Sequence, residues 1–324
     1  MDLSIYTTSA VKCFKQCRRR FYLEYVKGLK PISIPGALHV GTMYHKGVEL
    51  LLKGESLENI NAVIEKMQRD HCQEEGVDFS FEDMVTAQTM VKYFSLNTSW
   101  RAWKPVLIEK EFEVLTGYNK RLAGKIDLVI ETSDKKRYLV EHKTTSIWRD
   151  GSEYINHLYV DDQNLNYLYA YQRMLEDGVI TGRQLSGILY IVCEKANFTR
   201  YKATPAEERK YTRQGVLYAS QREEDEDEES YRYRVEKHYK YNQRVHEVFI
   251  RRTPEELDAA MKDFNATIKD IVSCDKAESY YRNSNACNLL PCPYASKCLV
   301  DDESTDCLFR QKEKLNEELK EKGK

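Results

Sequence analysis

The sequence lacks any hydrophobic run that could cross a membrane. Its longest apolar stretches, such as residues 106–108 and 188–193, are far shorter than the roughly 20 residues that a membrane helix needs. Residues 1–6 also lack the basic start and the apolar stretch of a secretory signal. We therefore expect a soluble, cytoplasmic protein with no membrane partner.

A large net charge is also absent, because 50 Lys and Arg residues stand against 52 Asp and Glu residues. The overall charge therefore does not indicate nucleic-acid binding, but contacts to phosphates depend on local charge. Residues 1–30 contain seven Lys and Arg residues against only Asp2 and Glu24. Residues 223–229 form an acidic run, which is typical of a solvated, mobile loop.

Disulfides are not expected among the nine cysteines, because the chain shows no secretion signal and the cytosol keeps thiols reduced. Four cysteines, Cys287, Cys292, Cys298 and Cys307, lie within one short segment. This clustering indicates a metal site. The short Cys-x2-Cys pairs of most structural zinc sites are missing from it.

The order of the predicted elements indicates an α/β fold. Helices are expected over residues 9–25, 41–52, 56–100 and 161–177. Strands are expected over residues 105–114, 122–131, 137–143 and 184–192, with some strand in an inserted segment over 199–250. The last long helix should begin at Thr253, which can form a capping box with Glu256. We see no internal repeat.

Two carboxylates and a lysine lie on the central predicted strands. Asp127 lies in a strand that is otherwise fit for burial, and Glu141 and Lys143 follow the apolar residues 138–140. Residues i and i+2 of a strand share a face, so Glu141 and Lys143 point together and Asp127 can face them. Two carboxylates form a hard-oxygen site suited to Mg²⁺ or Mn²⁺, and a nearby lysine can stabilise developing charge. The alternatives are a buried salt bridge and a chance Glu-x-Lys pattern.

Three further polar residues accompany this group. His45 lies on a predicted helix, and a neutral imidazole is a common ligand of catalytic metals. Gln163 and Tyr167 share one helix face at spacing i, i+4, where Gln163 can hydrogen-bond the lysine or a phosphate. A structural or exposed histidine and an ordinary polar helix face are the alternatives.

The ordered set of His45, Asp127, Glu141-x-Lys143 and Gln163-x-x-x-Tyr167 resembles the RecB-type branch of the PD-(D/E)XK nuclease superfamily. That branch includes the nuclease domains of RecB and AddB, CRISPR-associated exonucleases and many phage exonucleases. The resemblance spans roughly residues 4–300. The residue before the Asp is Ile126 and not the Pro of the superfamily motif; the absence of this Pro is usual for the RecB-type branch.

The resemblance implies specific roles. His45, Asp127 and Glu141 would bind the divalent metal with the carbonyl of His142. Lys143 would be catalytic, and two further residues, Gln163 and Tyr167, would organise the site and the DNA.

The resemblance also implies a 4Fe-4S cluster. The segment Cys17-Arg-Arg-Arg-Phe-Tyr22 is similar to the N-terminal signature of the iron–sulfur members, in which one early and three late cysteines hold the cluster. The implied ligands are Cys17, Cys287, Cys292 and Cys298. Cys307 could replace Cys17, and zinc or ordinary buried thiols are further alternatives. The cluster would hold Arg18, Arg19 and Arg20 against DNA.

The implied fold is a restriction-endonuclease-like core, a small mixed sheet flanked by helices, with added helical and cysteine-bearing parts. The expected parts are an N-terminal helical part (1–100), a nuclease core (101–200), an insertion with the acidic loop (201–250), a C-terminal helix with the cysteines (251–309) and a charged tail (310–324).

The expected function is that of a DNA exonuclease acting on single strands or duplex ends, in phage or bacterial recombination, repair or CRISPR adaptation. Its expected partners are DNA and a helicase, a recombinase or a CRISPR adaptation protein. A non-catalytic DNA-binding scaffold of the same fold and a zinc-stabilised interaction module are the alternatives.

Overall fold

The computed structural model describes residues 5–32, 36–116, 119–148, 151–289, 292–300, 303–313 and 319. Most of the charged tail expected over 310–324 lies outside these residues. Residues 310 and 311 belong to a short strand.

The described strands form a six-stranded mixed sheet and a separate two-stranded pair. The strands are β1 (Ile5–Thr7), β2 (Leu29–Pro31), β3 (Lys104–Leu115), β4 (Arg121–Glu131), β5 (Arg137–Thr145), β6 (Gly187–Glu194), β7 (Val245–Ile250) and β8 (Phe309–Gln311). The large sheet has the order β1-β4-β5-β6-β7, and β3 also pairs with β4. β1 with β4 and β5 with β6 are parallel pairs, whereas β3–β4, β4–β5 and β6–β7 are antiparallel.

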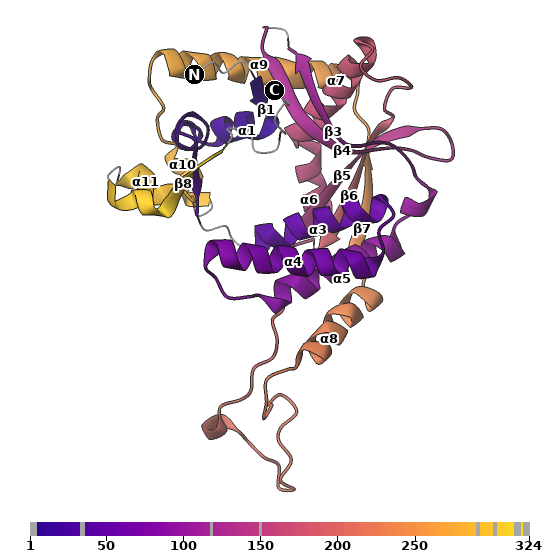
Figure 1. Cartoon of the computed structure of the whole chain (residues 1–324), viewed down its shortest axis with the longest axis vertical. Helices are drawn as coiled ribbons and strands as arrows, with labels where there is room; N and C mark the ends of the chain where they lie inside the picture. Colours follow the sequence, from indigo (N-terminus) through magenta and orange to yellow (C-terminus); the bar gives the residue numbers. More distant parts are fainter. Residues whose placement is uncertain are drawn as a thin grey trace.

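Helices lie on both faces of this sheet (Figure 1). They are α1 (Thr8–Gln16), α2 (Arg18–Phe21), α3 (Gly36–Leu52), α4 (Leu57–Glu75), α5 (Phe81–Asn97), α6 (Ser152–Tyr159), α7 (Asp162–Glu176), α8 (Glu228–Tyr241), α9 (Pro254–Lys276), α10 (Ser284–Leu289) and α11 (Ala295–Leu299). A turn of π-helix spans Tyr22–Val26, and 3-10 turns span Trp100–Ala102, Ala206–Glu208 and Glu303–Leu308. No helix within the described ranges is long and apolar enough to span a membrane.

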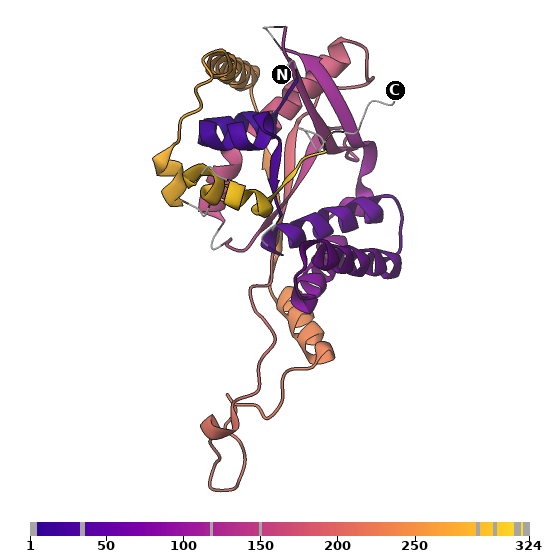
Figure 2. The ribbon, with the colours of Figure 1, turned by 60° about the vertical axis from the view of Figure 1, so that its left-hand side comes forward.

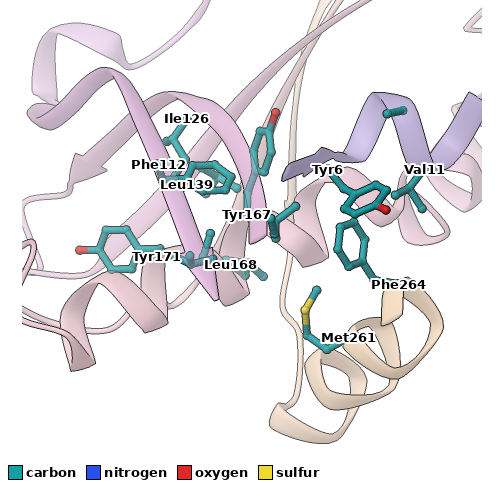
Figure 3. Packing of buried hydrophobic residues seen from close by; sticks show 14 of the residues in the cluster. Tyr6, Val11, Phe112, Ile126, Leu139, Tyr167, Leu168, Tyr171, Met261 and Phe264 are labelled. Carbon is teal, nitrogen blue, oxygen red and sulfur yellow. The ribbon is translucent and has the colours of Figure 1, made fainter. Parts of the chain in front are cut away.

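The sheet separates two apolar layers. One layer packs α1, α7 and α9 against the sheet and includes Tyr6, Phe112, Tyr167 and Phe264 (Figure 3). The other packs α3, α4, α5 and α8 against the opposite face. Gly47 lets α3 approach α5 closely, because a Cβ at this position would lie 2.5 Å from Val91 Cγ2. This contact fixes the helix that carries His45.

Local sequence signals explain most element boundaries. The predicted capping box is confirmed, since Glu256 N donates to Thr253 Oγ1 and Thr253 N donates to Glu256 Oε2. α1 begins at Thr8, one residue earlier than expected. Thr7 is its N-cap residue, because the Thr7 side chain accepts a hydrogen bond from Ala10 N. The helix expected from residue 41 begins at Gly36, and the strand expected from residue 184 begins at Gly187.

The continuous helix predicted over residues 9–25 is wrong. Cys17 has extended backbone angles and divides this segment into α1, α2 and the π-helical turn. The C-terminal segment takes up backbone groups at the break: Asn283 Nδ2 donates to Gln16 O, and Arg19 N donates to Tyr281 O. These contacts join the two ends of the described chain, and α10, α11 and β8 lie beside α1 (Figure 1).

The interpretation of residues 223–229 as a mobile loop is wrong for its second half. Asp227 caps α8 by accepting from Ser230 N, and three apolar residues of this helix, Tyr231, Val235 and Tyr239, are buried. Glu226 is also buried and forms a bidentate ion pair with Arg234, at 2.9 Å to Nε and 2.6 Å to Nη2. Residues 199–227 form an extended arm that leaves the body next to α8 (Figures 1 and 2).

Replacing Glu226 by alanine should destabilise α8 by about 3 kcal/mol, because it leaves the partly buried Arg234 without its carboxylate. Hydrogen bonds from Arg234 hold the pKa of Glu226 below its usual range, so the ion pair stabilises the fold above the carboxyl's unfolded pKa. This stabilisation is lost as the pH falls through the folded pKa. Urea unfolding followed by circular dichroism measures the difference, and Glu224→Ala, an exposed neighbour, is the control.

Candidate active site

The site lies where two central strands separate. Backbone pairing between β4 and β5 begins with the pair Glu131–Arg137 and ends with the pair Leu128–Val140. The same antiparallel register would next pair Asp127 with Glu141. The two predicted carboxylates therefore face each other where the pairing of their strands ends.

The ammonium group of Lys143 is held by three acceptors. Its Nζ lies 3.0 Å from Glu141 Oε1 and 3.1 Å from Asp161 Oδ2, and donates to Gln163 Oε1 at 3.3 Å. An ammonium group has three donor hydrogens, so all three are engaged. Burial alone would lower the pKa of Lys143, but the charges of Glu141 and Asp161 outweigh it and raise the pKa. Lys143 is therefore a fixed cation.

The two facing carboxylates are poorly compensated. Burial raises the pKa of Asp127 to about 7, with further contributions from the charges of Glu141 and Glu109 that Lys125 and Lys143 only partly offset. Burial also raises the pKa of Glu141. Buried negative charge of this kind is stabilised by a bound cation. The donor set, two hard carboxylates with an imidazole nearby, fits Mg²⁺ or Mn²⁺.

His45 completes this group from the helical layer. It projects from α3, and its Nδ1 lies 3.7 Å from Asp127 Oδ2. Burial, followed by the charges of Lys143 and Lys125, lowers the pKa of His45 to about 4. The ring is therefore neutral at pH 7, the form in which imidazole binds a metal.

His142 belongs to the apolar layer. Its ring is 4% exposed, packs edge-on against Phe94 and Tyr44, and has no hydrogen-bond partner on either nitrogen within the described residues. Burial, followed by the neighbouring His45, lowers the pKa of His142 to about 3. The predicted role of His142 concerns its carbonyl, and that role stays a prediction.

Gln163 and Tyr167 lie together on α7, as their spacing predicted. Gln163 Nε2 donates to Tyr167 Oη at 3.4 Å, while its Oε1 accepts from Lys143. The ring of Tyr167 packs edge-on against Phe112 (Figure 3). Gly124 makes room for this pair, because a Cβ there would lie 2.8 Å from Phe112 Cζ. The polar side chains of α7 are thereby fixed against the sheet.

Three charged residues of the site were not predicted. Asp161 contacts the lysine and caps α7 by accepting from Gln163 N. Glu109 pairs with Lys125 beside Asp127, and its φ of 51° is in the left-handed region that favours glycine. The available signal for Asp161 was its position as a helix-capping residue two places before Gln163. The sequence carries no comparable signal for Glu109.

The described residues contain no group of three or more His, Cys, Asp and Glu side chains positioned to hold a metal ion. At the carboxylate pair, Glu141 Oε1 already forms an ion pair with Lys143 Nζ. The predicted four-cysteine cluster is likewise not assembled in this part of the chain.

The cysteines nevertheless lie near the junction of the two chain ends. Cys17 is buried at the break between α1 and α2. Burial raises the pKa of the Cys292 thiol, and the nearby Cys287 and Cys17 raise it further. Cys298 packs with Cys292 in a small apolar cluster around Leu23, Tyr294 and Phe309. Cys307 is exposed and lies outside that cluster.

The three arginines predicted to bind DNA have partners within the protein. Arg18 lies 3.7 Å from Asp270 and over the ring of Tyr281, and Arg20 pairs with Glu24. Arg19 lies over the ring of Tyr22. These contacts stabilise the junction of the chain ends, and DNA binding by the arginines stays a prediction.

Comparison with known families identifies the class of the protein. The family model of the PD-(D/E)XK nuclease superfamily matches residues 6–299, which is most of the chain. The chain therefore belongs to the PD-(D/E)XK nuclease superfamily. No curated protein matches the chain. Membership indicates a phosphodiesterase with a nucleic-acid substrate that typically uses a divalent metal, and it does not identify the branch of the superfamily.

Proposed function

We propose that the protein is a metal-dependent DNA exonuclease that acts on single strands or duplex ends. The observation that carries the proposal is the convergence of Asp127, Glu141 and Lys143 where β4 and β5 separate. Superfamily membership supports hydrolysis of a phosphodiester. The choice of DNA and of chain ends rests on the resemblance of the motif set to the RecB-type branch.

The proposed roles follow from charge and position. Asp127 and Glu141 would hold a divalent metal, with His45 as a neutral ligand from α3 and the His142 carbonyl as a further donor. The metal would supply Lewis acidity and a more acidic bound water. Lys143, held as a cation, stabilises the negative charge that develops on the phosphate oxygens. Gln163 and Tyr167 orient Lys143 and would contact the DNA backbone.

The test is a nuclease assay on end-labelled single- and double-stranded DNA with Mg²⁺ or Mn²⁺. An exonuclease releases mononucleotides or short fragments from the ends and leaves circular DNA intact. Cleavage of circular DNA would overturn the exonuclease part of the proposal. Binding of DNA without cleavage under either metal would favour a non-catalytic scaffold instead.

We propose in addition that Cys17, Cys287, Cys292 and Cys298 bind a 4Fe-4S cluster that joins the two chain ends. The support is the resemblance of the Cys17 segment and the contacts of the C-terminal segment with the α1–α2 break. In this proposal the cluster is structural, because hydrolysis of a phosphodiester transfers no electron.

Anaerobic purification followed by metal analysis tests the cluster. The proposal predicts about four iron atoms per chain, because a 4Fe-4S cluster contains four. It also predicts absorbance at about 400 nm, which is typical of iron–sulfur clusters. Cys17→Ser should lose the iron, whereas Cys307→Ser should keep it. Zinc in place of iron would overturn the proposal of an iron–sulfur cluster. Loss of iron in Cys307→Ser but not in Cys17→Ser would show that Cys307, and not Cys17, is the fourth ligand.

Metal affinity should rise with pH and level off above about pH 7, because the metal must displace a proton from Asp127, whose pKa is raised to about 7. Below that value the affinity should fall by up to about tenfold per pH unit. Mn²⁺ titrations followed by electron paramagnetic resonance measure this dependence. Asp127→Asn, in which Mn²⁺ binding should be lost at every pH, is the control for binding at this site, and a flat profile in the unaltered protein would contradict the prediction.

A further inference from the structure

Two carboxylates bracket the ammonium group of Lys143. Glu141 Oε1 lies 3.0 Å from Nζ, and Asp161 Oδ2 lies 3.1 Å from it. The two carboxylates have different surroundings. Glu141 lies on β5 opposite Asp127, whereas Asp161 lies at the start of α7, where its second oxygen accepts a hydrogen bond from Gln163 N.

The proposed function places competing demands on Glu141. A metal ion and the lysine ammonium both need its oxygens, and both are cations. A carboxylate that binds a metal gives up part of its negative charge, so its attraction for the ammonium weakens. Unless another anion holds it, Lys143 would then either keep Glu141 from the metal or lose its fixed position.

Asp161 is built to hold the lysine. Its side chain is 9% exposed, so the ion pair is shielded from water and stronger than a surface pair. The capping bond from Gln163 N to Asp161 Oδ1 fixes the carboxylate and leaves Oδ2 directed at Lys143. The same helix start supplies Gln163 as the third acceptor. Two of the three acceptors therefore remain when Glu141 turns to a metal.

We propose that Asp161 is a positioning residue that retains Lys143 and so frees Glu141 to bind the metal. This inference rests on the proposed function. Asp161 itself need not touch the metal or the DNA. Its effect on the metal passes through the lysine, and this dependence can be separated from its role as a helix cap.

Asp161→Asn separates the two roles. Asn caps helices as well as Asp does, so α7 should keep its start. The amide has one oxygen, and if that oxygen accepts from Gln163 N, the amide NH₂ group faces the ammonium of Lys143, donor against donor. Lys143 then relies more on Glu141. Asp227→Asn is a matched control, because Asp227 caps α8 in the same way by accepting from Ser230 N at 2.7 Å.

The experiment measures Mn²⁺ binding by electron paramagnetic resonance and steady-state DNA hydrolysis in the unaltered protein and in four variants. The variants are Asp161→Asn, Asp161→Asn combined with Lys143→Met, Asp227→Asn and Asp127→Asn. Asp161→Asn should weaken Mn²⁺ binding and lower kcat, each by about 10- to 100-fold, the range typical of residues that support metal ligands. KM for DNA should stay within about threefold, because Asp161 does not contact the bound DNA in this proposal. Asp161→Asn combined with Lys143→Met should regain tight Mn²⁺ binding without activity, because no lysine remains to compete for Glu141.

The outcomes separate this inference from the proposed function. Unchanged Mn²⁺ binding and kcat in Asp161→Asn would overturn the inference alone. Weak binding that the second substitution does not restore would assign the effect to α7 and not to the lysine, and would also overturn it. If Mn²⁺ binding is the same in the unaltered protein and in Asp127→Asn, the proposed metal site is wrong and the inference fails with it.

Discussion

Asp127→Asn is expected to reduce metal-dependent DNA hydrolysis by at least about 1,000-fold, because it removes a charged ligand of the proposed metal and the metal supplies several kcal/mol of transition-state stabilisation. Mn²⁺ binding should be lost in parallel. The measurement is the release of label from end-labelled DNA at saturating Mn²⁺, with Mn²⁺ binding measured on the same preparations.

The fold of this variant should remain at least as stable as that of the unaltered protein. Asp127 has a folded pKa raised to about 7, well above the value of an exposed Asp, so its ionised form destabilises the metal-free fold as the pH rises toward 7. Removing the charge should therefore leave the melting temperature at pH 8 equal or higher. Asp134→Asn, in the exposed β4–β5 turn, is the control and should leave the activity unchanged. A large fall in melting temperature would assign the loss of activity to unfolding.

Lys143→Met is expected to lower kcat by about 100- to 1,000-fold, the usual cost of removing a group that stabilises developing charge in the transition state. Methionine keeps an unbranched side chain of nearly the same length and removes its charge. Metal binding should be retained or become tighter, because Glu141 loses the cation that competes with the metal. This separation of hydrolysis from metal binding distinguishes the lysine from the ligands.

Single-turnover hydrolysis and Mn²⁺ titration of Lys143→Met measure the two effects. Lys136→Met provides the control, since Lys136 lies in the exposed β4–β5 turn and pairs only with a surface Asp among the contacts described. Hydrolysis within about threefold of the unaltered rate would exclude Lys143 as a catalytic group, because a transition-state contact is worth more than that.

The sequence predicted the sheet around the site because its strands are apolar and bounded by turn residues. The facing of Asp127 and Glu141 followed from strand periodicity, and the contact between Gln163 and Tyr167 followed from helix spacing. These contacts depend on short-range geometry, which the sequence determines. The catalytic and metal-binding roles of these residues stay predictions.

The errors arose where distant segments decide the local structure. At the break near Cys17, Asn283, more than 260 residues away in the sequence, donates to Gln16 O. The helix α8 was missed because its buried residues, Tyr231, Val235 and Tyr239, are separated by charged residues that resemble a solvated loop. Asp161 was missed because a capping Asp looks the same in sequence whether or not a lysine faces it.

The measurement that tests the central claim most directly is hydrolysis of end-labelled linear DNA by anaerobically purified protein, with Mg²⁺, with Mn²⁺ and with a chelator. Progressive release of the end label is expected with either metal and none with the chelator, and Asp127→Asn should release the label at least about 1,000-fold more slowly. Hydrolysis that persists in the chelator or at a similar rate in Asp127→Asn, or DNA that stays intact with both metals, would contradict this claim.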